Sequence, residues 1–277
     1  MACRSILVHC DATRGTAARL AVAGHLAERL AAHLIGVHVH QPFQAPMFSD
    51  AVSAIDALHA AYAKRARTEE ADAKSVFEDS VAGKDLSYEW RADKGIIENV
   101  LIGASRFADL VVLGQRDPEA PPTSAPSDLV ERVVMASERP ALIVPHVGVA
   151  KMPGVNVMVC WNGSREAVRA ATGALPLLEH AKRVDLLMVD ARKISAATAP
   201  AADFAGWLRR HGIEAAVHYD STDGSDIGGV ILSRAADNDV DLIVMGLYGH
   251  SRMRELVLGG ASRTLLASMT VPLLVAH

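Results

Sequence analysis

Glycines cluster near the end of this chain, with a spacing that could bind an anion through backbone groups. Met245–Gly249 reads Met-Gly-Leu-Tyr-Gly and follows the apolar run 242–244, and 259–262 reads Gly-Gly-Ala-Ser. This order predicts a buried parallel strand, a glycine loop and the start of a helix, where α/β proteins hold phosphate groups. Glycine lets the backbone turn tightly and approach a ligand, and the free N–H groups at 259–261 would face it.

Two well-known nucleotide-binding motifs are missing from the sequence. It contains neither Gly-x-Gly-x-x-Gly after a first strand nor Gly-x4-Gly-Lys-Ser/Thr. A Rossmann or P-loop enzyme is therefore not expected.

Histidines and cysteines offer few further sites for chemistry. His38 and His40 share one face of an expected strand, but no Cys, Asp or Glu at a companion spacing completes a metal site, so polar residues at a strand end are favoured. Cys10 and Cys160 occupy equivalent strand ends, and no base follows either at a catalytic spacing. We expect no catalytic residue and no metal ligand.

The elements that would position the glycine loop occur twice. Residues 108–114 (Ala-Asp-Leu-Val-Val-Leu-Gly) reappear as 240–246 (Val-Asp-Leu-Ile-Val-Met-Gly), and 5–11 resembles 156–162. Each copy also ends on an apolar strand, at 139–145 or 271–276. These repeats predict a tandem duplication over nearly the whole chain.

The duplication predicts two domains, 1–148 and 152–277, which are joined where Gly148, Pro153 and Gly154 interrupt the apolar pattern. Short β-branched runs alternate with longer amphipathic runs, which is typical of βαβ units and a mostly parallel sheet. The expected strands are 4–11, 34–40, 87–92, 109–114 and 141–146 in the first half, and 156–161, 184–189, 213–219, 241–246 and 272–276 in the second.

The two halves differ in a helix and in a loop. The first half has a long helical stretch, 49–81, whose outward charges predict a solvated face or a partner surface. Its counterpart of the glycine loop, 115–127, contains Pro118, Pro121, Pro122 and Pro126 and no glycine. Proline has no N–H to donate, so we expect the first half to have lost nucleotide binding and to serve as a structural or pairing partner.

Composition limits the classes of partner. The net charge is −4, the pI is near 6.3 and lysine and arginine form no large cluster, so nucleic acid and anionic membranes are poor partners. The sequence has no run of 18 apolar residues and no charged leader into an apolar segment. With three cysteines, too few for a disulfide framework, these features predict a soluble cytoplasmic protein.

The glycine spacing resembles that of the universal stress protein family. Gly246, Gly249 and Gly259 fit the Gly-x2-Gly-x9-Gly-Ser/Thr pattern of its ATP-binding members, and Gly260 stands where the family has Ser or Thr. With the repeat, the chain is similar to the tandem two-domain type. The resemblance implies two flavodoxin-like domains, of the adenine nucleotide alpha hydrolase-like kind, each with a five-stranded parallel sheet in the order 3-2-1-4-5 and helices on both faces.

The same resemblance implies an ATP site in the second half, with or without Mg. The implied residues are Cys160, Asn162, Val189, Met245, Gly246, Gly249, Gly259, Gly260, Ala261 and Ser262. Asn162 replaces the family's Asp, which Asp11 retains in the first half, and Asn162 and Ser164 could equally cap the next helix. Val189 would offer backbone groups to the adenine.

The departure at Gly260 removes a hydroxyl whose phosphate contact is worth about 1 kcal/mol, while the N–H donors remain. Ser262 could substitute for it if the helix start is slightly shifted. Three arginines, Arg252, Arg254 and Arg263, could add charge near the phosphates, although solvent exposure is the simpler expectation.

Because the site has no general base or nucleophile, the resemblance implies an adenine-nucleotide binding or sensing module in the stress response. Two alternatives stay open: a slow ATP hydrolase, and a stress protein that binds no nucleotide and acts through protein contacts. We expect the halves to pack as a pseudo-dimer within the chain, because the apolar last strands need cover at their edges. A homo-oligomer of the whole chain is also open.

Overall fold

Strands and helices alternate along the chain, as its apolar runs predict. The computed structural model describes residues 2–43, 52–119, 125–190, 200–223, 226–248 and 260–277, without the side chains of 52–55. The strands are β1 (Ser5–His9), β2 (His33–His40), β3 (Tyr88–Lys94), β4 (Leu110–Gly114), β5 (Ala141–Val144), β6 (Asn156–Cys160), β7 (Arg183–Val189), β8 (Ala215–Asp220), β9 (Leu242–Gly246) and β10 (Leu273–Ala276). All ten predicted strands are confirmed, with small differences at their ends.

The helices connect successive strands. They are α1 (Gly15–Leu30), α2 (Val52–Val81), α3 (Ile97–Ser105), α4 (Leu129–Ser137), α5 (Arg165–Leu178), α6 (Ala201–Arg210), α7 (Ile227–Asp237) and α8 (Gly260–Ser268). In the described residues, the outward charges of α2 include the i,i+4 pairs Arg65–Glu69 and Lys74–Glu78, as in a solvated face. None of the described helices has the length and hydropathy needed to cross a membrane.

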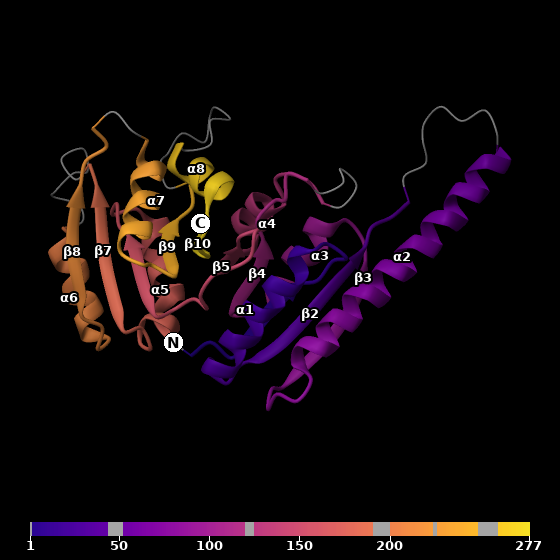
Figure 1. The fold of residues 1–277 in the computed structure, drawn as a ribbon, viewed down its shortest axis with the longest axis horizontal. Coiled ribbons are helices and arrows are strands. Elements are labelled where there is room, and N and C mark those ends of the chain that lie inside the picture. The colour runs from indigo at the N-terminus through magenta and orange to yellow at the C-terminus, as the bar shows by residue number, and fades with distance from the viewer. Residues whose placement is uncertain (1, 44–51, 120–124, 191–199, 224–225, 249–259) are drawn as a thin grey trace.

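The two halves share one sheet of ten strands, in the order β3-β2-β1-β4-β5-β10-β9-β6-β7-β8 (Figure 1). Within each half the predicted order 3-2-1-4-5 is confirmed, and its strands are parallel. The two five-stranded sheets are joined into one, because β5 and β10 pair antiparallel, with Leu274 opposite Leu142. The last strands thus cover each other's edges, as expected. Pairing satisfies the N–H and C=O groups that each last strand would otherwise leave at an open edge.

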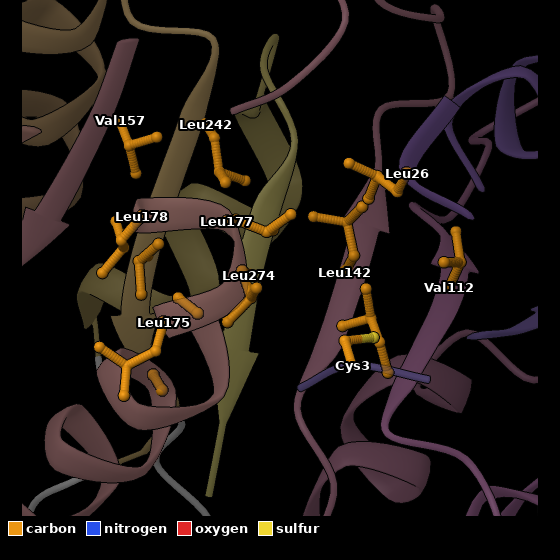
Figure 2. Packing of buried hydrophobic residues seen from close by; sticks show 14 of the residues in the cluster. Cys3, Leu26, Val112, Leu142, Val157, Leu175, Leu177, Leu178, Leu242 and Leu274 are labelled. Carbon is orange, nitrogen blue, oxygen red and sulfur yellow. The ribbon is translucent and has the colours of Figure 1, made fainter. Parts of the chain in front are cut away.

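The core has two layers because side chains alternate across each strand. On one face, strand residues such as Leu142 and Leu274 pack with apolar side chains of α1, α2, α5 and α6. On the other face, residues such as Ile143 and Leu273 pack with α3, α4, α7 and α8. Figure 2 shows Leu142 and Leu274 with Leu177 of α5 in the first of these layers. The predicted covering of both faces by helices is confirmed.

The segment between the halves passes close to α1. Gly148 and Gly154 both have positive φ, of 86° and 104°, which glycine adopts readily. Arg29 of α1 donates from Nη2 to the carbonyl of Gly154 at 3.0 Å, so this segment is held against the first half. The domain bounds 1–148 and 152–277 remain a prediction, and they fall between β5 and β6.

Candidate functional site

The strand ends of the second half bring several of the predicted site residues to one edge of the sheet. The central strand β6 lies between β7 and β9, and all three run parallel. Cys160, Val189 and Gly246 are the last residues of β6, β7 and β9, and Met245 precedes Gly246. In open α/β sheets, ligands bind at the carboxyl ends of the strands, which is where these residues lie.

Gly246 is a glycine because the chain packs tightly around it. A Cβ at this position would lie 2.5 Å from the backbone nitrogen of Ala167 and 2.6 Å from the backbone carbon of Glu166. The first turn of α5 therefore sits directly on the end of β9. Sequence reasoning attributed this glycine to ligand approach, but its nearest neighbours in the structure are protein backbone.

The start of α8 lies close to the residues that directly follow β9. The backbone N–H of Tyr248 donates to Oγ of Ser262 at 3.4 Å, and Ser262 is buried. Tyr248 itself adopts a φ of 60°, which is uncommon for a residue other than glycine. The Ser262 hydroxyl thus joins the loop to the first turn of the helix.

Gly260 begins α8, as the predicted helix start requires. It is exposed, and a Cβ added to it would meet no atom within 4 Å. Ala261, next to it, is partly buried, whereas Arg263 is exposed as expected. Gly249, Gly259, Arg252 and Arg254 lie outside the described residues.

Asn162 and Ser164 organise the start of α5. Oδ1 of Asn162 accepts from the N–H of Ser164 at 3.1 Å, and Oγ of Ser164 accepts from the N–H of Ala167 at 3.2 Å. Ser164 is therefore the N-cap, and Asn162 supports the turn before it. The predicted capping role is confirmed, and Asn162 remains exposed at the strand edge.

The cysteines at the two strand ends have the character of packed thiols. Burial raises the pKa of both Cys10 and Cys160 to about 12, so each stays protonated at neutral pH. A protonated thiol is a poor nucleophile.

His38 and His40 of β2 contact protein groups. Nδ1 of His38 lies 3.0 Å from the carbonyl oxygen of Cys10. Nε2 of His40 lies 2.9 Å from Oε2 of Glu70. Among the residues described, no group of three or more His, Cys, Asp or Glu could hold a metal ion.

The equivalent edge of the first half is organised by a buried arginine, which sequence reasoning missed. Arg19 of α1 donates from Nη2 to Oδ1 of Asp11 and to Oγ1 of Thr16, both at 2.6 Å, and from Nε to the carbonyl of His9 at 3.0 Å. Burial raises the pKa of Asp11, but Arg19, His9 and hydroxyl donors outweigh it and hold this pKa well below its usual range.

The signal for Arg19 was available in the sequence. This charged residue interrupts an apolar helical stripe that includes Leu20, Ala23 and Leu26. A charge on a buried helix face needs a partner, and Asp11 at the end of β1 supplies one. The guanidinium of Arg19 also lies where a Cβ on Gly114 would be, so Gly114 leaves room for it.

Two cavities open at this edge of the first half. The larger has a volume of about 500 Å³ and lies beyond the ends of β1 and β2, next to α2. The smaller, of about 330 Å³, lies toward the end of β4. His9, Asp11, Thr13 and Asp117 line both of them. The expected loss of nucleotide binding from this half stays a prediction. Even without a nucleotide site, this edge of the sheet has open cavities.

Known proteins resemble this chain in sequence over its second half and in fold over its whole length. The family model "Universal stress protein family" matches residues 155–277. No curated protein sequence matches the chain. A universal stress protein from Archaeoglobus fulgidus DSM 4304 superposes with a TM-score of 0.74 at 19% identity, covering 98% of this chain and 97% of its own.

A functionally unknown protein from Pseudomonas aeruginosa PAO1 superposes with a TM-score of 0.59 at 14% identity, covering 99% of this chain and 92% of its own. At these identities the two structures show a shared fold, which extends over both halves. The second half of the chain, residues 155–277, thus matches the universal stress protein family, and the shared fold covers both halves.

Proposed function

We propose that the second half binds an adenine nucleotide, ATP, at the carboxyl edge of β6, β7 and β9, and acts as a binding or sensing module in the stress response. The placement of α8 carries this proposal. The hydrogen bond from Tyr248 to Ser262 holds the helix N-terminus beside the residues that directly follow β9. A helix N-terminus presents unpaired N–H groups and the positive end of the helix dipole, both of which favour phosphate.

The remaining proposed contacts surround this helix start. Cys160, Asn162 and Val189 would lie on the nucleoside side, with Val189 offering backbone groups. Met245, Gly246, Gly249, Gly259, Gly260, Ala261 and Ser262 would lie on the phosphate side. The protonated thiol of Cys160 supports a binding role over nucleophilic chemistry, so any hydrolysis should be slow.

Calorimetric titration of the whole chain with ATP, with and without Mg, tests the proposal. We expect at most one site per chain, because the first-half loop, residues 115–127, contains four prolines and no glycine. Gly249→Val and Gly259→Val should abolish binding, because a branched side chain would block close approach of the backbone to phosphate. Circular dichroism of each variant establishes that it is folded.

Gly260→Ser provides the opposite test at the same site. The open space around Gly260 admits a serine side chain, and one neutral hydrogen bond of about 1 kcal/mol corresponds to roughly fivefold lower Kd. Unchanged ATP binding by a folded Gly249→Val variant, or two equivalent sites per chain, would contradict the proposal. Mass spectrometry of ligand released from freshly purified protein gives an independent check.

A further inference from the structure

The larger cavity of the first half is lined by apolar side chains and by charged side chains at its rim. Val39 and Ile97, both buried core residues, contribute apolar surface to its lining, and Tyr62 of α2 forms part of its wall. The phenol of Tyr62 is held in place because its OH donates to the carbonyl of Gln41 at 2.8 Å. A volume of about 500 Å³ lies within the range of small-molecule sites.

A buried histidine faces this cavity with unused hydrogen-bonding capacity. His9 is 4% exposed, and its ring makes no hydrogen bond among the described residues. Its nearest charged partner is Oδ2 of Asp11, 3.9 Å from Nδ1. Burial lowers the pKa of His9 to about 4, so the ring is neutral at pH 7 and offers one donor and one acceptor. A polar ligand group would satisfy it.

Carboxylates outnumber guanidiniums in the cavity lining. The four carboxylates are Asp11, Glu69, Asp117 and Glu119, and the two guanidiniums are Arg14 and Arg65. Arg65 forms an ion pair with Glu69, and Asp11 forms an ion pair with Arg19 of α1. Among the described residues, Arg14 is the ion-pair partner of both Asp117, at 3.0 Å, and Glu119, at 2.9 Å. This side of the rim therefore carries an uncompensated negative charge.

We propose that the first-half cavity binds a small organic amine with an aromatic body. The body would rest on Val39, Ile97 and Tyr62, a polar group would hydrogen-bond to His9, and the ammonium would lie toward Asp117 and Glu119. An anionic ligand would face the same two carboxylates and be disfavoured. The site is distinct from the nucleotide site proposed for the second half, so either can be absent without the other.

Two probes with the same body and opposite charge test the charge preference. Tryptamine and indole-3-propionate each carry an indole on a two-carbon chain, which ends in an ammonium or a carboxylate. We expect tryptamine to bind the full chain with a Kd about fivefold or more below that of indole-3-propionate, the effect of one partly exposed ion pair. Titration calorimetry and saturation-transfer NMR measure both affinities.

Two sets of variants locate the binding. Ala66 of α2 lines the cavity, and Ala66→Phe should abolish tryptamine binding by filling it. Ala71→Phe, at an exposed position of the same helix, should leave binding unchanged. The double variant Asp117→Asn with Glu119→Gln should remove or reverse the preference for tryptamine, because Arg14 is then unpaired. Glu78→Gln, elsewhere on α2, should retain the preference.

The proposal fails if tryptamine shows no saturable binding up to millimolar concentration, or if the carboxylate binds equally well. Persistence of tryptamine binding in a folded Ala66→Phe variant would also overturn it, as would displacement of tryptamine by ATP. Should Ala66→Phe not fold, the charge variants decide, since both substitutions lie on the rim of the cavity. ATP titration of the same samples tests the second half separately.

Discussion

The side chains at the end of β1 form a small ionic network inside the first half. Arg19 holds Asp11 and the carbonyl of His9, and Asp11 also accepts from Thr16 Oγ1 at 2.7 Å. Breaking a buried pair by removing one partner costs about 3–5 kcal/mol, because the other charge is left uncompensated. The network therefore holds Asp11 and His9, which both line the cavity, in fixed positions.

His9 should make the stability of the protein depend on pH. Its pKa falls from 6.5 to about 4 in the folded state, mainly because of burial. Between these two pH values the unfolded chain is protonated at His9 and the folded chain is not. The free energy of unfolding should therefore decrease by about 3 kcal/mol in total as the pH falls from 6.5 toward 4, and His9 should not change it above pH 6.5. Denaturant unfolding at several pH values between 7 and 4 measures it.

The variant His9→Gln should flatten this pH dependence, because glutamine does not titrate. His59→Gln, which changes an exposed histidine of α2, serves as the matched control and should retain the parent slope. Asp11 does not confound the window, since its pKa lies below the usual carboxyl range and its stabilisation is lost only at lower pH. A parent slope that survives in His9→Gln would show that another group causes it.

At the scale of elements, Gly246→Ala tests whether the end of β9 is a packing contact. The added Cβ would collide with backbone atoms of Glu166 and Ala167, which cannot move without shifting α5, so we expect a loss of about 1–3 kcal/mol. Gly103→Ala, in α3 with open space around it, should stabilise the protein by about 0.5–1 kcal/mol through helix propensity. Urea unfolding of both variants measures the difference.

If Gly246→Ala is neutral in stability, the contact with α5 is looser than the structure indicates. A variant that keeps its stability but loses ATP would instead assign Gly246 to the ligand. The two readouts therefore separate packing from binding at this one position.

Sequence reasoning predicted the strands well because their signals are local, whereas the strand order came from the resemblance to a known family. Apolar runs such as Leu110–Gly114 and Leu242–Gly246 are short and continuous, and each is preceded by an aspartate, Asp109 or Asp241. What it missed depends on partners far away in the chain. The joined sheet needs the pairing of Leu142 with Leu274, and the role of Gly246 needs the position of α5. For the buried Arg19 the sequence offered a signal, a charge within an apolar helical stripe, but its partner Asp11 is set by the fold.

The whole molecule is held together across the junction by more than strand pairing. Gln115, after β4, donates from Nε2 to the carbonyls of Leu266 and Ala267 at the end of α8, at 2.9 and 3.1 Å. Its Oε1 accepts from the N–H of His146 at 3.0 Å. The loop that corresponds to the glycine loop thus contacts the helix proposed to hold phosphate in the other half. Gln115 therefore connects the carboxyl end of β4 to the C-terminal end of α8, the end opposite the helix start proposed to hold phosphate.

A shared sheet should make the halves unfold together, and the three tryptophans allow each half to be followed. Trp90 lies in β3, whereas Trp161 and Trp207 stack on Phe204 in the second half. A Trp90→Phe variant reports the second half, and a Trp161→Phe, Trp207→Phe variant reports the first. Fluorescence of both should give one coincident urea transition.

Introducing Leu274→Ala into both reporter variants makes the test directional. Leu274 is fully buried in β10, opposite Leu142, and its truncation should cost about 2–5 kcal/mol. If the junction couples the halves, the Trp90 signal in the first half should shift to lower urea as far as the second-half signal. A shift confined to Trp161 and Trp207 would mean that each half is stable alone and that the β5–β10 pairing joins two independent units.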